Sequence, residues 1–568
     1  MNRRVCVFTR PILLMLGALI LSLSGALASA VPAAGQGSPG QPFSRQKSYF
    51  VQAVLDNGDG ALSEANYKNP AGPICYTVTS SAANANTDCE GVAPHNETTI
   101  AINPTDPLNR IGSANDYQLF LSSGGHINET IYSRAHVTFD GGQTWTTYPI
   151  NYNGYIATGD PAVSFDADGT AYLSTLGFVF SQAGPGGNTP DILVAHSTDG
   201  GKTWSTPVRV AHGTGTFTSP GIFNDKPFMV AWGHGNAIVT WSQFNDGRGG
   251  SYISSPIFAA VTHDGGQTWT TGVEISGSAP FCIGAQGGTI CNQDQGSITV
   301  VAADGSIYVA FENYYNNDPN SLAYGADQYL VVQVDPATGQ RIAGPHQVAQ
   351  LVDGVYDYPT DAEGRQTYQD SQFRSWSVGN LTADPTNAAH LAVIWSDMRN
   401  SRLPSSPAAY NPDPYSVKTN SDVIVSQSYD GGVTWSAPQA IKLPGDQFMP
   451  WGVYDGAGRL RVGFFDRSYD PANHSYGYSV ASESKPGSLR FSRVQVSTVL
   501  SDPTQGDRWF SGVTVNAGFP HPASFLGDYS GIAVSSTGVA ALWTDMRLNV
   551  CFTVRCGASE DAFIGVTP

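Results

Sequence analysis

The sequence predicts an all-β fold, a β-propeller of four-stranded antiparallel blades, and three observations support it. A turn sequence, D-G-G-x-T-W, occurs four times; each copy follows a strand-like run; and the copies recur along most of the chain. Glycine reaches positive φ without a steric cost and Asp accepts N–H groups of its own turn, so each copy is typical of a β-hairpin. Such repetition indicates one supersecondary unit stacked many times. The four copies begin at Asp140, Asp199, Asp264 and Asp430.

A longer unit of an apolar strand, a turn and two further strands can be followed through the chain. It begins in turn near Glu97, Asp160, Asp225, Asp294, Ser377, Asp446 and Gly527, with degenerate copies of the turn at Asp335 and Ser484. Seven units predict seven blades; six is the alternative if two of the units are one. The last unit lacks a fourth strand, and we expect residues 48–55 to supply it and close the ring, because closure removes free sheet edges.

The first 30 residues have the pattern of a secretory signal peptide. Three arginines precede an apolar stretch that ends at the cleavage motif Ala28-Ser29-Ala30. We expect residues 31–45 to form a flexible leader and residues 46–568 a single propeller domain. The apolar stretch is short for a membrane span, so the expected product is a secreted or cell-surface protein without an integral membrane segment, acting as a monomer.

The chain is acidic, with a formal net charge of −18, and loss of the three arginines with the signal peptide makes it −21. Coulomb repulsion then disfavours nucleic acid and anionic membranes as partners. An acidic ligand would need a locally basic pocket.

Six cysteines remain once Cys6 leaves with the signal peptide. An even number in an exported chain predicts disulfides, and local pairing is the simplest of the fifteen connectivities. No C-x-x-C motif supports zinc as the alternative. The expected pairs are Cys75 with Cys89, Cys282 with Cys291, and Cys551 with Cys556.

The repeated turns, together with the stretch Ala101-Ile102-Asn103-Pro104, resemble the Asp-box (bacterial neuraminidase repeat) propellers of the sialidase superfamily, over roughly residues 90–568. The resemblance is to secreted bacterial sialidase-like glycosyl hydrolases. It implies three arginines around a substrate carboxylate, a Tyr–Glu nucleophile pair and an Asp acid/base. The first arginine of that family lies in an R-I-P motif, and Arg110-Ile111-Gly112 lacks the proline, so its role is not assigned to Arg110. The Asp boxes themselves lie on outer hairpins, and we interpret them as structural.

The polar residues at the inner strand starts form the first candidate ring, since these starts surround one mouth of a propeller channel. Clustered carboxylates raise one another's pKa and can act as an acid/base pair, or they can bind a cation such as Ca²⁺, with Asp294 as a ligand. The alternative is that each caps its own turn. The ring contains Glu97, Asp160, Asp225, Asp294, Asp446 and Asp528.

Three arginines at the ends of second strands form the second candidate ring. Arg399, Arg467 and Arg547 follow W-S-D-M, F-F-D and W-T-D-M in consecutive units and could clamp a carboxylate or sulfate. The alternative is that each pairs with the Asp just before it.

Tyr529, beside Asp528, is the candidate nucleophile, and Glu312 is its candidate base. Two aromatic loops, residues 353–358 and 410–415, suit stacking on sugar rings. The sequence thus predicts a glycoside hydrolase with Asp528, Tyr529, Glu312, Asp160 and Asp225 as catalytic candidates, and Arg399, Arg467, Arg547, Glu97 and Asp446 as substrate-binding candidates. A non-catalytic propeller that binds glycan or protein at the same mouth is the alternative.

Overall fold

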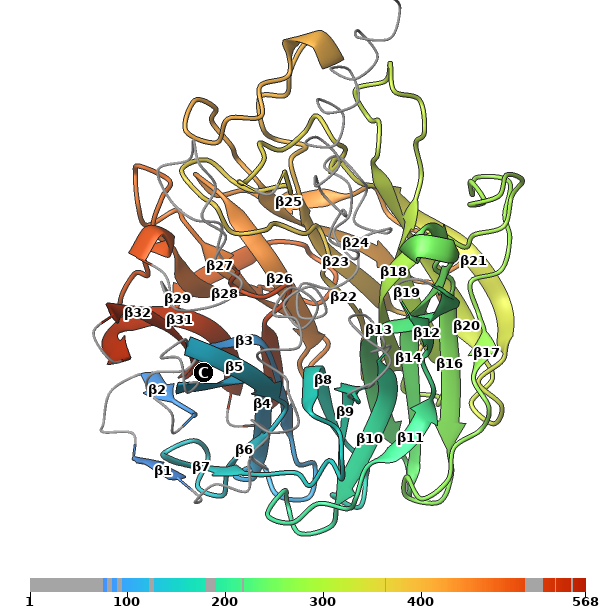
Figure 1. The fold of residues 1–568 in the computed structure, drawn as a ribbon, viewed down its shortest axis with the longest axis vertical. Helices are drawn as coiled ribbons and strands as arrows, with labels where there is room; N and C mark the ends of the chain where they lie inside the picture. The colour runs from blue at the N-terminus through green and yellow to red at the C-terminus, as the bar shows by residue number, and fades with distance from the viewer. Residues whose placement is uncertain are drawn as a thin grey trace, which may run out of the picture.

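A ring of seven antiparallel sheets makes up the fold (Figure 1). The computed structural model describes residues 75–78, 84–88, 94–121, 127–179, 190–216, 219–362, 364–505, 525–536, 538–552 and 555–567. The strands of each sheet run outward in chain order from the innermost one, with two exceptions: the N-terminal segment supplies the outermost strands of the first and last sheets, and a short strand at residues 214–216 precedes the inner strand of the third. The prediction of a seven-bladed β-propeller is therefore confirmed.

Each blade runs from an inner strand at the axis to an outer strand at the rim. In this order, blade 1 consists of β3 (His95–Ile102), β4 (Arg110–Leu121), β6 (Ala135–Thr138), β7 (Thr144–Tyr148) and β1 (Cys75–Val78), and blade 2 of β8 (Ala157–Phe165), β9 (Ala171–Phe178), β10 (Asp191–Ser197) and β11 (Val208–Ala211). Blade 3 consists of β13 (Ser219–Trp232), β14 (Asn236–Asp246), β16 (Ile257–Thr262) and β17 (Val273–Glu274). Blade 4 consists of β18 (Asp294–Val301), β19 (Ile307–Tyr314), β20 (Asp327–Val334) and β21 (Arg341–Gln350). Blade 5 consists of β22 (Asn380–Ala383), β23 (Leu391–Asp397), β24 (Asp422–Ser428) and β25 (Gln439–Ile441). Blade 6 consists of β26 (Gln447–Tyr454), β27 (Leu460–Asp466), β28 (Gly477–Glu483) and β29 (Phe491–Gln495). Blade 7 consists of β30 (Gly531–Ser535), β31 (Gly538–Phe552), β32 (Arg555–Thr567) and β2 (Asn84–Asn86). Blade 1 also contains the short strand β5 (Ile127–Tyr132), and blade 3 also contains β12 (Thr214–Thr216) and β15 (Tyr252–Ser254). The described residues include three single turns of 3-10 helix: η2 (Arg248–Gly250), η3 (Pro407–Ala409) and η4 (Pro503–Gln505).

The ring closes through an N-terminal strand, as expected, but the predicted segment was wrong. Strand β2 pairs with β32 as the outer strand of blade 7, with Asn84 opposite Gly565 and Asn86 opposite Phe563. Residues 48–55, which we expected in this place, lie outside the described residues. A three-residue strand without a hydrophobic run has no pattern that distinguishes it from a loop.

The four Asp boxes connect the third and fourth strands of blades 1, 2, 3 and 5, at the rim of the ring. In the first box, Asp140 Oδ1 accepts the backbone N–H groups of Gln143 at 2.8 Å and Thr144 at 2.9 Å. The indole of Trp145 is fully buried and donates to the carbonyl of Gly142 at 3.2 Å. The other three aspartates accept the equivalent bonds, so the structural interpretation of the boxes is confirmed for Asp199, Asp264 and Asp430.

One of the three predicted disulfides is present in the structure. Cys282 and Cys291 are bonded and buried in the core between blades 3 and 4. Strands β31 and β32 place Cys551 opposite Cys556, and that bond stays a prediction. Cys89 lies outside the described residues, so its pairing with Cys75 also stays a prediction.

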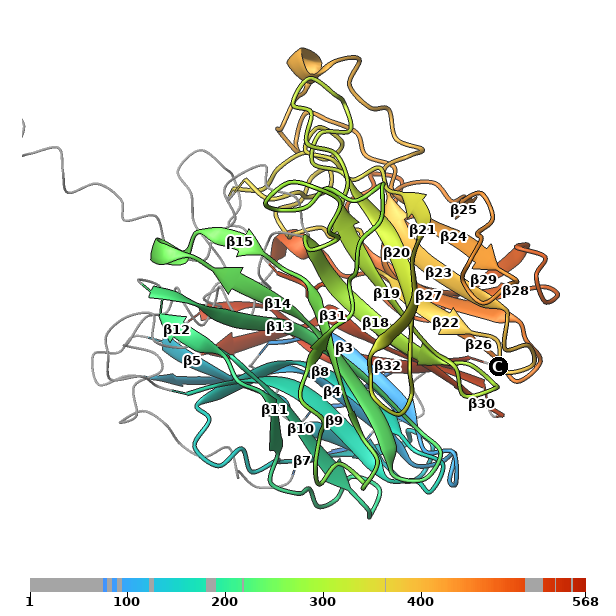
Figure 2. The ribbon, with the colours of Figure 1, turned by 90° about the vertical axis from the view of Figure 1, so that its right-hand side faces the viewer.

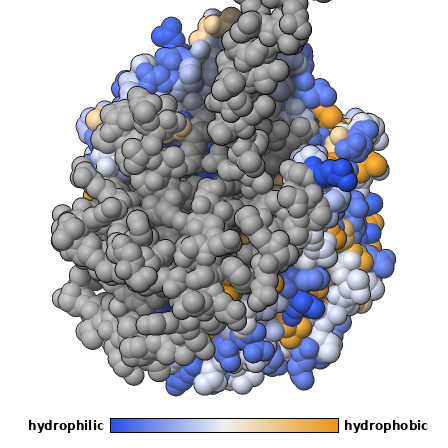
Figure 3. All heavy atoms as spheres, in the orientation of Figure 1, coloured by the Kyte–Doolittle hydropathy of each residue, from blue (hydrophilic) through white to orange (hydrophobic). Residues whose placement is uncertain are grey.

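The described surface in Figure 3 is mostly hydrophilic, with small separate hydrophobic areas. Exposed apolar side chains such as Ile342 and Val433 occur singly, as is usual for a propeller rim. Among the described residues, none of the helices has the length and apolar character needed to cross a membrane.

Candidate functional site

Five of the inner strands contain a β-bulge in the part that pairs with the end of the second strand. Register shifts interrupt the pairing of β3, β8, β13, β18 and β26 with the second strand of each blade. The first bulge residue has a positive φ in all five blades: 55° at Glu97, 54° at Asp160, 50° at Lys226, 67° at Gly296 and 46° at Met449. This conformation is unfavourable for residues with a Cβ, so the surrounding structure must stabilise it.

The prediction that six carboxylates occupy equivalent positions is wrong at three blades. Asp225, Asp294 and Asp446 lie one, two and three residues before the bulge, whereas Glu97 and Asp160 occupy it. The bulge adds a residue to the inner strand, and an apolar pattern does not reveal the shift. The three displaced carboxylates accept hydrogen bonds from neighbouring side chains: Gln295 at 3.2 Å, Asn313 at 2.5 Å and Thr419 at 2.7 Å, respectively.

At the axis, side chains from blades 1, 2, 3 and 7 form a buried ionic group that we call the axial cluster: Glu97, Asp160, Lys226, Asp528 and Arg374. The ammonium of Lys226 lies 2.7 Å from Asp528, 2.8 Å from Glu97 and 3.4 Å from Asp160. All three carboxylates are fully buried, and Lys226 is 5% exposed. One lysine thus neutralises carboxylates from three different blades.

Arg374 completes this cluster from the long connection between blades 4 and 5. Its guanidinium donates to both oxygens of Asp528, with Nε 2.9 Å from Oδ1. Asn115 donates to Glu97 Oε2 at 3.0 Å and accepts the backbone N–H of Asp160 at 2.7 Å. Neither Lys226 nor Arg374 was among the residues predicted from sequence. Arg374 lies in no repeat and no motif, so the sequence contains no signal for it.

The axial cluster separates the protonation states of two neighbouring carboxyl groups. Burial, and then the charge of Asp160, raise the pKa of Glu97 well above its usual range. Burial acts in the same direction on Asp528, but Arg374 and Lys226 outweigh it and hold the pKa of Asp528 below its usual range. Opposite pKa shifts of this kind distinguish an acid from an ionised carboxylate in many hydrolases.

Tyr529 and Glu312 are not in contact with each other. The Tyr529 ring lies 5.2 Å from the Lys226 ammonium, and its hydroxyl has a pKa raised well above the usual value by burial and by Glu97. Glu312 instead accepts a hydrogen bond from the indole of Trp376, and burial, followed by Asp327, raises its pKa. A neutral Tyr529 without Glu312 beside it does not match the predicted nucleophile pair.

Beside Lys226 and Tyr529 lies a narrow, mainly apolar cavity of about 30 Å³, enough for one or two water molecules but too small for a sugar ring. Its other walls are formed by Pro227, Phe228, Gly296, Ser297, Ile298, Trp376, Val378, Gly379 and Trp451.

The three arginines of the second predicted ring have separate sets of partners. Arg399 pairs with Asp397 through Nε at 2.8 Å and Nη2 at 2.6 Å, and Arg547 pairs with Asp545 at 2.8 and 2.7 Å. Arg467 is fully buried, lies 3.4 Å from Asp446 and donates to backbone carbonyls. Each guanidinium group thus has carboxylate or carbonyl partners of its own, which disfavours the expected anion clamp.

A larger cavity, the loop pocket, lies among the long connections of blades 4 and 5 and has a volume of about 340 Å³. These connections lie together at one end of the molecule, in the upper part of Figures 1 and 2. The two aromatic loops expected to stack on sugars both contribute to it. The pocket is lined by Tyr356, Asp357, Tyr358, Pro359, Met398, Ser401, Arg402, Leu403, Pro404, Ser405, Ala409, Tyr410, Asn411, Val417, Lys418 and Thr419.

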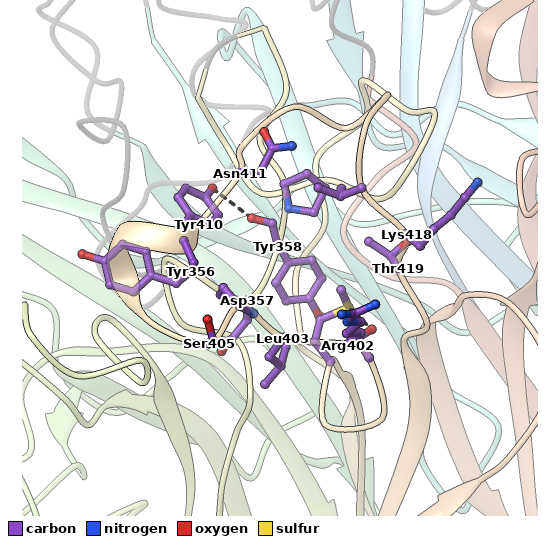
Figure 4. A pocket seen from close by; sticks show the side chains of 16 residues that line it. Tyr356, Asp357, Tyr358, Arg402, Leu403, Ser405, Tyr410, Asn411, Lys418 and Thr419 are labelled. Atoms are coloured by element: carbon purple, nitrogen blue, oxygen red, sulfur yellow. Dashed lines mark hydrogen bonds between the residues drawn. The ribbon is translucent and has the colours of Figure 1, made fainter.

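Aromatic rings and charged groups occupy different sides of this pocket (Figure 4). The rings of Tyr356 and Tyr410 pack edge to face at 5.4 Å, and the Tyr410 hydroxyl donates to the carbonyl of Tyr358 at 3.0 Å. The side chain of Lys418 lies across the pocket from Tyr356, and both Lys418 and Arg402 are exposed. The pocket therefore presents ring faces together with positive charge.

Among the described residues that line the loop pocket, Asp357 is the only one with a carboxyl group. Burial raises its pKa to about 7, with Asp397 adding repulsion and a 2.8 Å hydrogen bond from the Gly354 N–H acting against the rise. A carboxyl group that exchanges its proton near neutral pH at a pocket wall is the type of group that general acid/base catalysis uses.

Comparison with known proteins identifies the repeat. The family model described as BNR/Asp-box repeat matches residues 195–206, which include the box at Asp199. The chain is a seven-bladed β-propeller built on Asp-box repeats. A comparison with curated protein sequences finds no match.

Solved structures with a similar arrangement of strands are distant in sequence. A protein of unknown function from Dyadobacter fermentans is 12% identical with a TM-score of 0.42, over 74% of this chain and 97% of that one. A mutant of NanB sialidase from Streptococcus pneumoniae is 7% identical with a TM-score of 0.40, over 87% and 94%. An α-L-arabinanase from Penicillium chrysogenum is 14% identical with a TM-score of 0.37, over 69% and 94%. Similarity at this level carries no information about the ligand of the Asp-box propeller described here.

Proposed function

We propose that this Asp-box propeller acts on glycans and that it binds an acidic sugar in the loop pocket. The observation that carries the proposal is the composition of the pocket wall, where tyrosine rings occur together with two exposed cations on an otherwise acidic chain. Its volume of about 340 Å³ is within the range of small-molecule sites. A neutral sugar would need no positive charge there, so we favour an acidic one.

Each part of the pocket has a matching part of such a ligand. The faces of Tyr356 and Tyr410 suit the apolar C–H face of a pyranose, and their fixed packing limits the entropy lost on binding. Arg402 donates in a planar fork that fits a carboxylate or a sulfate, and Lys418 adds a point charge. The net charge of the chain would otherwise repel this ligand.

Hydrolysis is the activity that we propose for this site, with Asp357 as the general acid. Its pKa of about 7 leaves a substantial fraction protonated at neutral pH, as a group that protonates a leaving oxygen requires. Arg402 and Lys418 would hold the substrate next to it.

The axial cluster is the second candidate for the hydrolytic site. The observation that favours it is that Glu97 and Asp528 both contact the ammonium group of Lys226. Both carboxyl oxygens lie within 2.8 Å of the same nitrogen, so they are at most about 5.6 Å apart. The upper limit coincides with the roughly 5–5.5 Å that separates the two carboxyl groups of retaining glycosidases. Of the residues predicted to be catalytic, Asp528 and Asp160 belong to this cluster and Tyr529 lies beside it, whereas Glu312 and Asp225 are not part of it. This candidate requires the narrow axial cavity to widen.

The test uses the full chain and a panel of sialylated, uronate-containing and neutral oligosaccharides, with binding measured by calorimetry and turnover by release of reducing sugar. We expect binding of one or more acidic members and turnover that Asp357→Asn abolishes while binding persists. Loss of turnover in Asp528→Asn but not in Asp357→Asn would favour the axial cluster. Binding without turnover would make the protein a glycan-binding propeller, the alternative predicted from sequence. Absence of binding to every acidic glycan would contradict the proposal.

The location of the protein outside the cell is part of the same proposal. A bonded cysteine pair fits an oxidising compartment, and the proposed substrate occurs on cell surfaces and in extracellular polymers. N-terminal sequencing of the exported protein would test it: we expect a mature chain that begins after Ala30.

A further inference from the structure

Two buried histidines from different strands of blade 1 direct ring nitrogens at the same carboxylate. His95 Nε2 lies 2.9 Å from Asp116 Oδ1, and His136 Nε2 lies 3.6 Å from Asp116 Oδ2. Both imidazoles and the carboxylate are fully buried. Within the described residues, neither Nε2 atom makes a hydrogen bond. A buried imidazole nitrogen and a carboxylate that face each other without a hydrogen bond need a proton or a metal cation between them.

The tautomer of His136 follows from its neighbour Thr87. The Thr87 hydroxyl lies 3.0 Å from the Ala562 carbonyl, to which only a donor can bond, and 3.0 Å from His136 Nδ1. The single hydroxyl proton is used at Ala562, so the hydroxyl oxygen accepts the proton of Nδ1. With the proton on Nδ1, a neutral imidazole at His136 would present the lone pair of Nε2 to the Asp116 carboxylate. Two lone pairs that face each other in a buried site repel unless a cation lies between them.

His95 has the same arrangement with a different partner. Its Nδ1 lies 3.5 Å from Asp88 Oδ2, and its Nε2 faces Asp116. A carboxylate beside the ring nitrogen that does not bind the metal is a common arrangement around metal-binding histidines. Thr87 and Asp88 are adjacent residues that directly follow β2, the strand that closes the ring. The closing segment therefore orients both imidazoles.

We propose that His95, His136 and Asp116 bind one divalent cation of the zinc type at the seam between blades 7 and 1. One ligand atom from each of the three residues can be chosen so that all lie within 4.8 Å of one another. Zinc bonds of roughly 2.0–2.2 Å place ligand atoms on one ion about 3–4 Å apart. Two imidazole nitrogens and a carboxylate favour zinc over calcium or magnesium, which take oxygen ligands. Arg134 donates to both oxygens of Asp116 and holds the carboxylate in place.

The expected role of the ion is to hold the closed ring together. Its ligands come from β3, β4 and β6 of blade 1, whereas the residues that orient them follow the outer strand of blade 7. Metal binding would therefore add to the three-residue pairing of β2 with β32. Sites with this function bind their metal as part of folding, and metal removal lowers stability.

The test measures zinc in the full chain after dialysis against metal-free buffer without chelator. We expect about one zinc per chain in the wild type and background amounts in His95→Gln and in His136→Gln. His390→Gln is the matched control, because His390 is also buried, contacts Asp384 at 2.9 Å and Tyr454 at 3.0 Å, and should leave the zinc content unchanged. Zinc retained in both ligand variants would overturn the site, and so would a wild type without zinc that takes up none when it is added.

A second measurement needs no variant and so remains informative if the histidine variants fail to fold. A strong chelator should lower the melting temperature of the wild type and accelerate hydrogen exchange at residues 84–88, and added zinc should reverse both changes. Cobalt in place of zinc should give the visible absorption bands of a four-coordinate site. A melting temperature indifferent to chelator and to zinc would contradict the proposal.

Discussion

In the axial cluster, Lys226 lies within 3.4 Å of three fully buried carboxylates, whereas in the loop pocket the exposed Arg402 and Lys418 make no ion pair within the described residues. Charges in the first region are satisfied by the protein itself. Those in the second are available to a ligand. The difference follows from where the charges are attached: strand bulges at the axis fix their side chains, and long connections leave theirs in solvent.

The difference between the axial cluster and the loop pocket shows that a group of charged residues is not by itself evidence of a binding site. A buried carboxylate costs free energy unless a partner compensates it, so blades that direct acids at the axis also need cations there. Lys226 and Arg374 supply them. The loop pocket has no such internal requirement, and its exposed cations are the ones that we propose to bind an anionic ligand.

The largest effect is expected from Lys226→Met, which would leave three buried carboxylates without their shared cation. Removal of one member of a buried ion pair typically costs about 3–5 kcal/mol, and we expect a loss of this size in the free energy of unfolding from denaturant titration. Arg209→Met is the control, because Arg209 is 55% exposed and lies 3.6 Å from Asp191, so its loss should cost less than about 1 kcal/mol. Equal losses in the two variants would show that the axial cluster is not compensated as described.

Asp357→Asn tests the carboxyl group of the loop pocket through pH. In the folded protein Asp357 has a pKa of about 7, while an unfolded Asp titrates near 4, so the folded state binds the extra proton between these values. The stability of the wild type should therefore fall as pH rises from about 4 to about 7. Asn cannot ionise and keeps an oxygen for the Gly354 N–H.

The variant should be more stable than the wild type at pH 8, by up to about 4 kcal/mol, and the difference should vanish near pH 4. Unfolding free energies at the two pH values provide the measurement. A pH-independent difference would mean that Asp357 titrates normally. A gain in stability with a loss of turnover would identify Asp357 as a group retained for activity.

Local patterns in the sequence were sufficient to predict the blades but not the site. The Asp boxes are recognisable because the Asp140 carboxylate bonds to residues only two to four positions away. Seven units and closure by an N-terminal segment followed from the same repetition. Asp225 and Asp446 were placed wrongly because they precede the bulge of their strands, by one and by three residues, and the apolar pattern does not show where a bulge lies.

The remaining site residues depend on contacts between blades that no sequence pattern records. Arg374 reaches Asp528 across 154 positions in the chain, and His95 meets His136 only because β3 and β6 belong to one blade. Arg399 and Arg547 were recognised as a repeated feature, but repetition reflected a local pair with the preceding Asp rather than a shared ligand. The loop pocket was predicted in composition, from its two aromatic loops, but not as a cavity.

Substitution of the loop-pocket cations should have a smaller effect, visible only in binding. Arg402→Ala and Lys418→Ala should each weaken the affinity for an acidic oligosaccharide about tenfold at low salt, and the loss of affinity should shrink as salt increases. The free energy of unfolding of each variant should stay within about 0.5 kcal/mol of the wild-type value. Lys485→Ala, an exposed cation in the turn between β28 and β29, is the control for net charge. An equal loss of affinity in the control would assign the effect to the overall charge of the chain rather than to the pocket.

The smallest effect is expected from Asp430→Ala, which provides an exposed carboxylate against which both regions can be compared. Asp430 accepts the backbone N–H groups of Val433 at 3.1 Å and Thr434 at 2.9 Å, and the bonds from Thr434 lower its pKa to about 2. We expect a loss of about 1 kcal/mol at pH 7 from these bonds. Because the folded pKa is lowered, this stabilisation is present above pH 4 and is lost toward pH 2, in the opposite direction to Asp357. Asp335→Ala is the control, since the Asp335 carboxylate of the degenerate box in blade 4 accepts one backbone N–H, from Ala337 at 2.8 Å. If Asp335→Ala lost as much free energy of unfolding as Asp430→Ala, box geometry would contribute little to the stability of a blade.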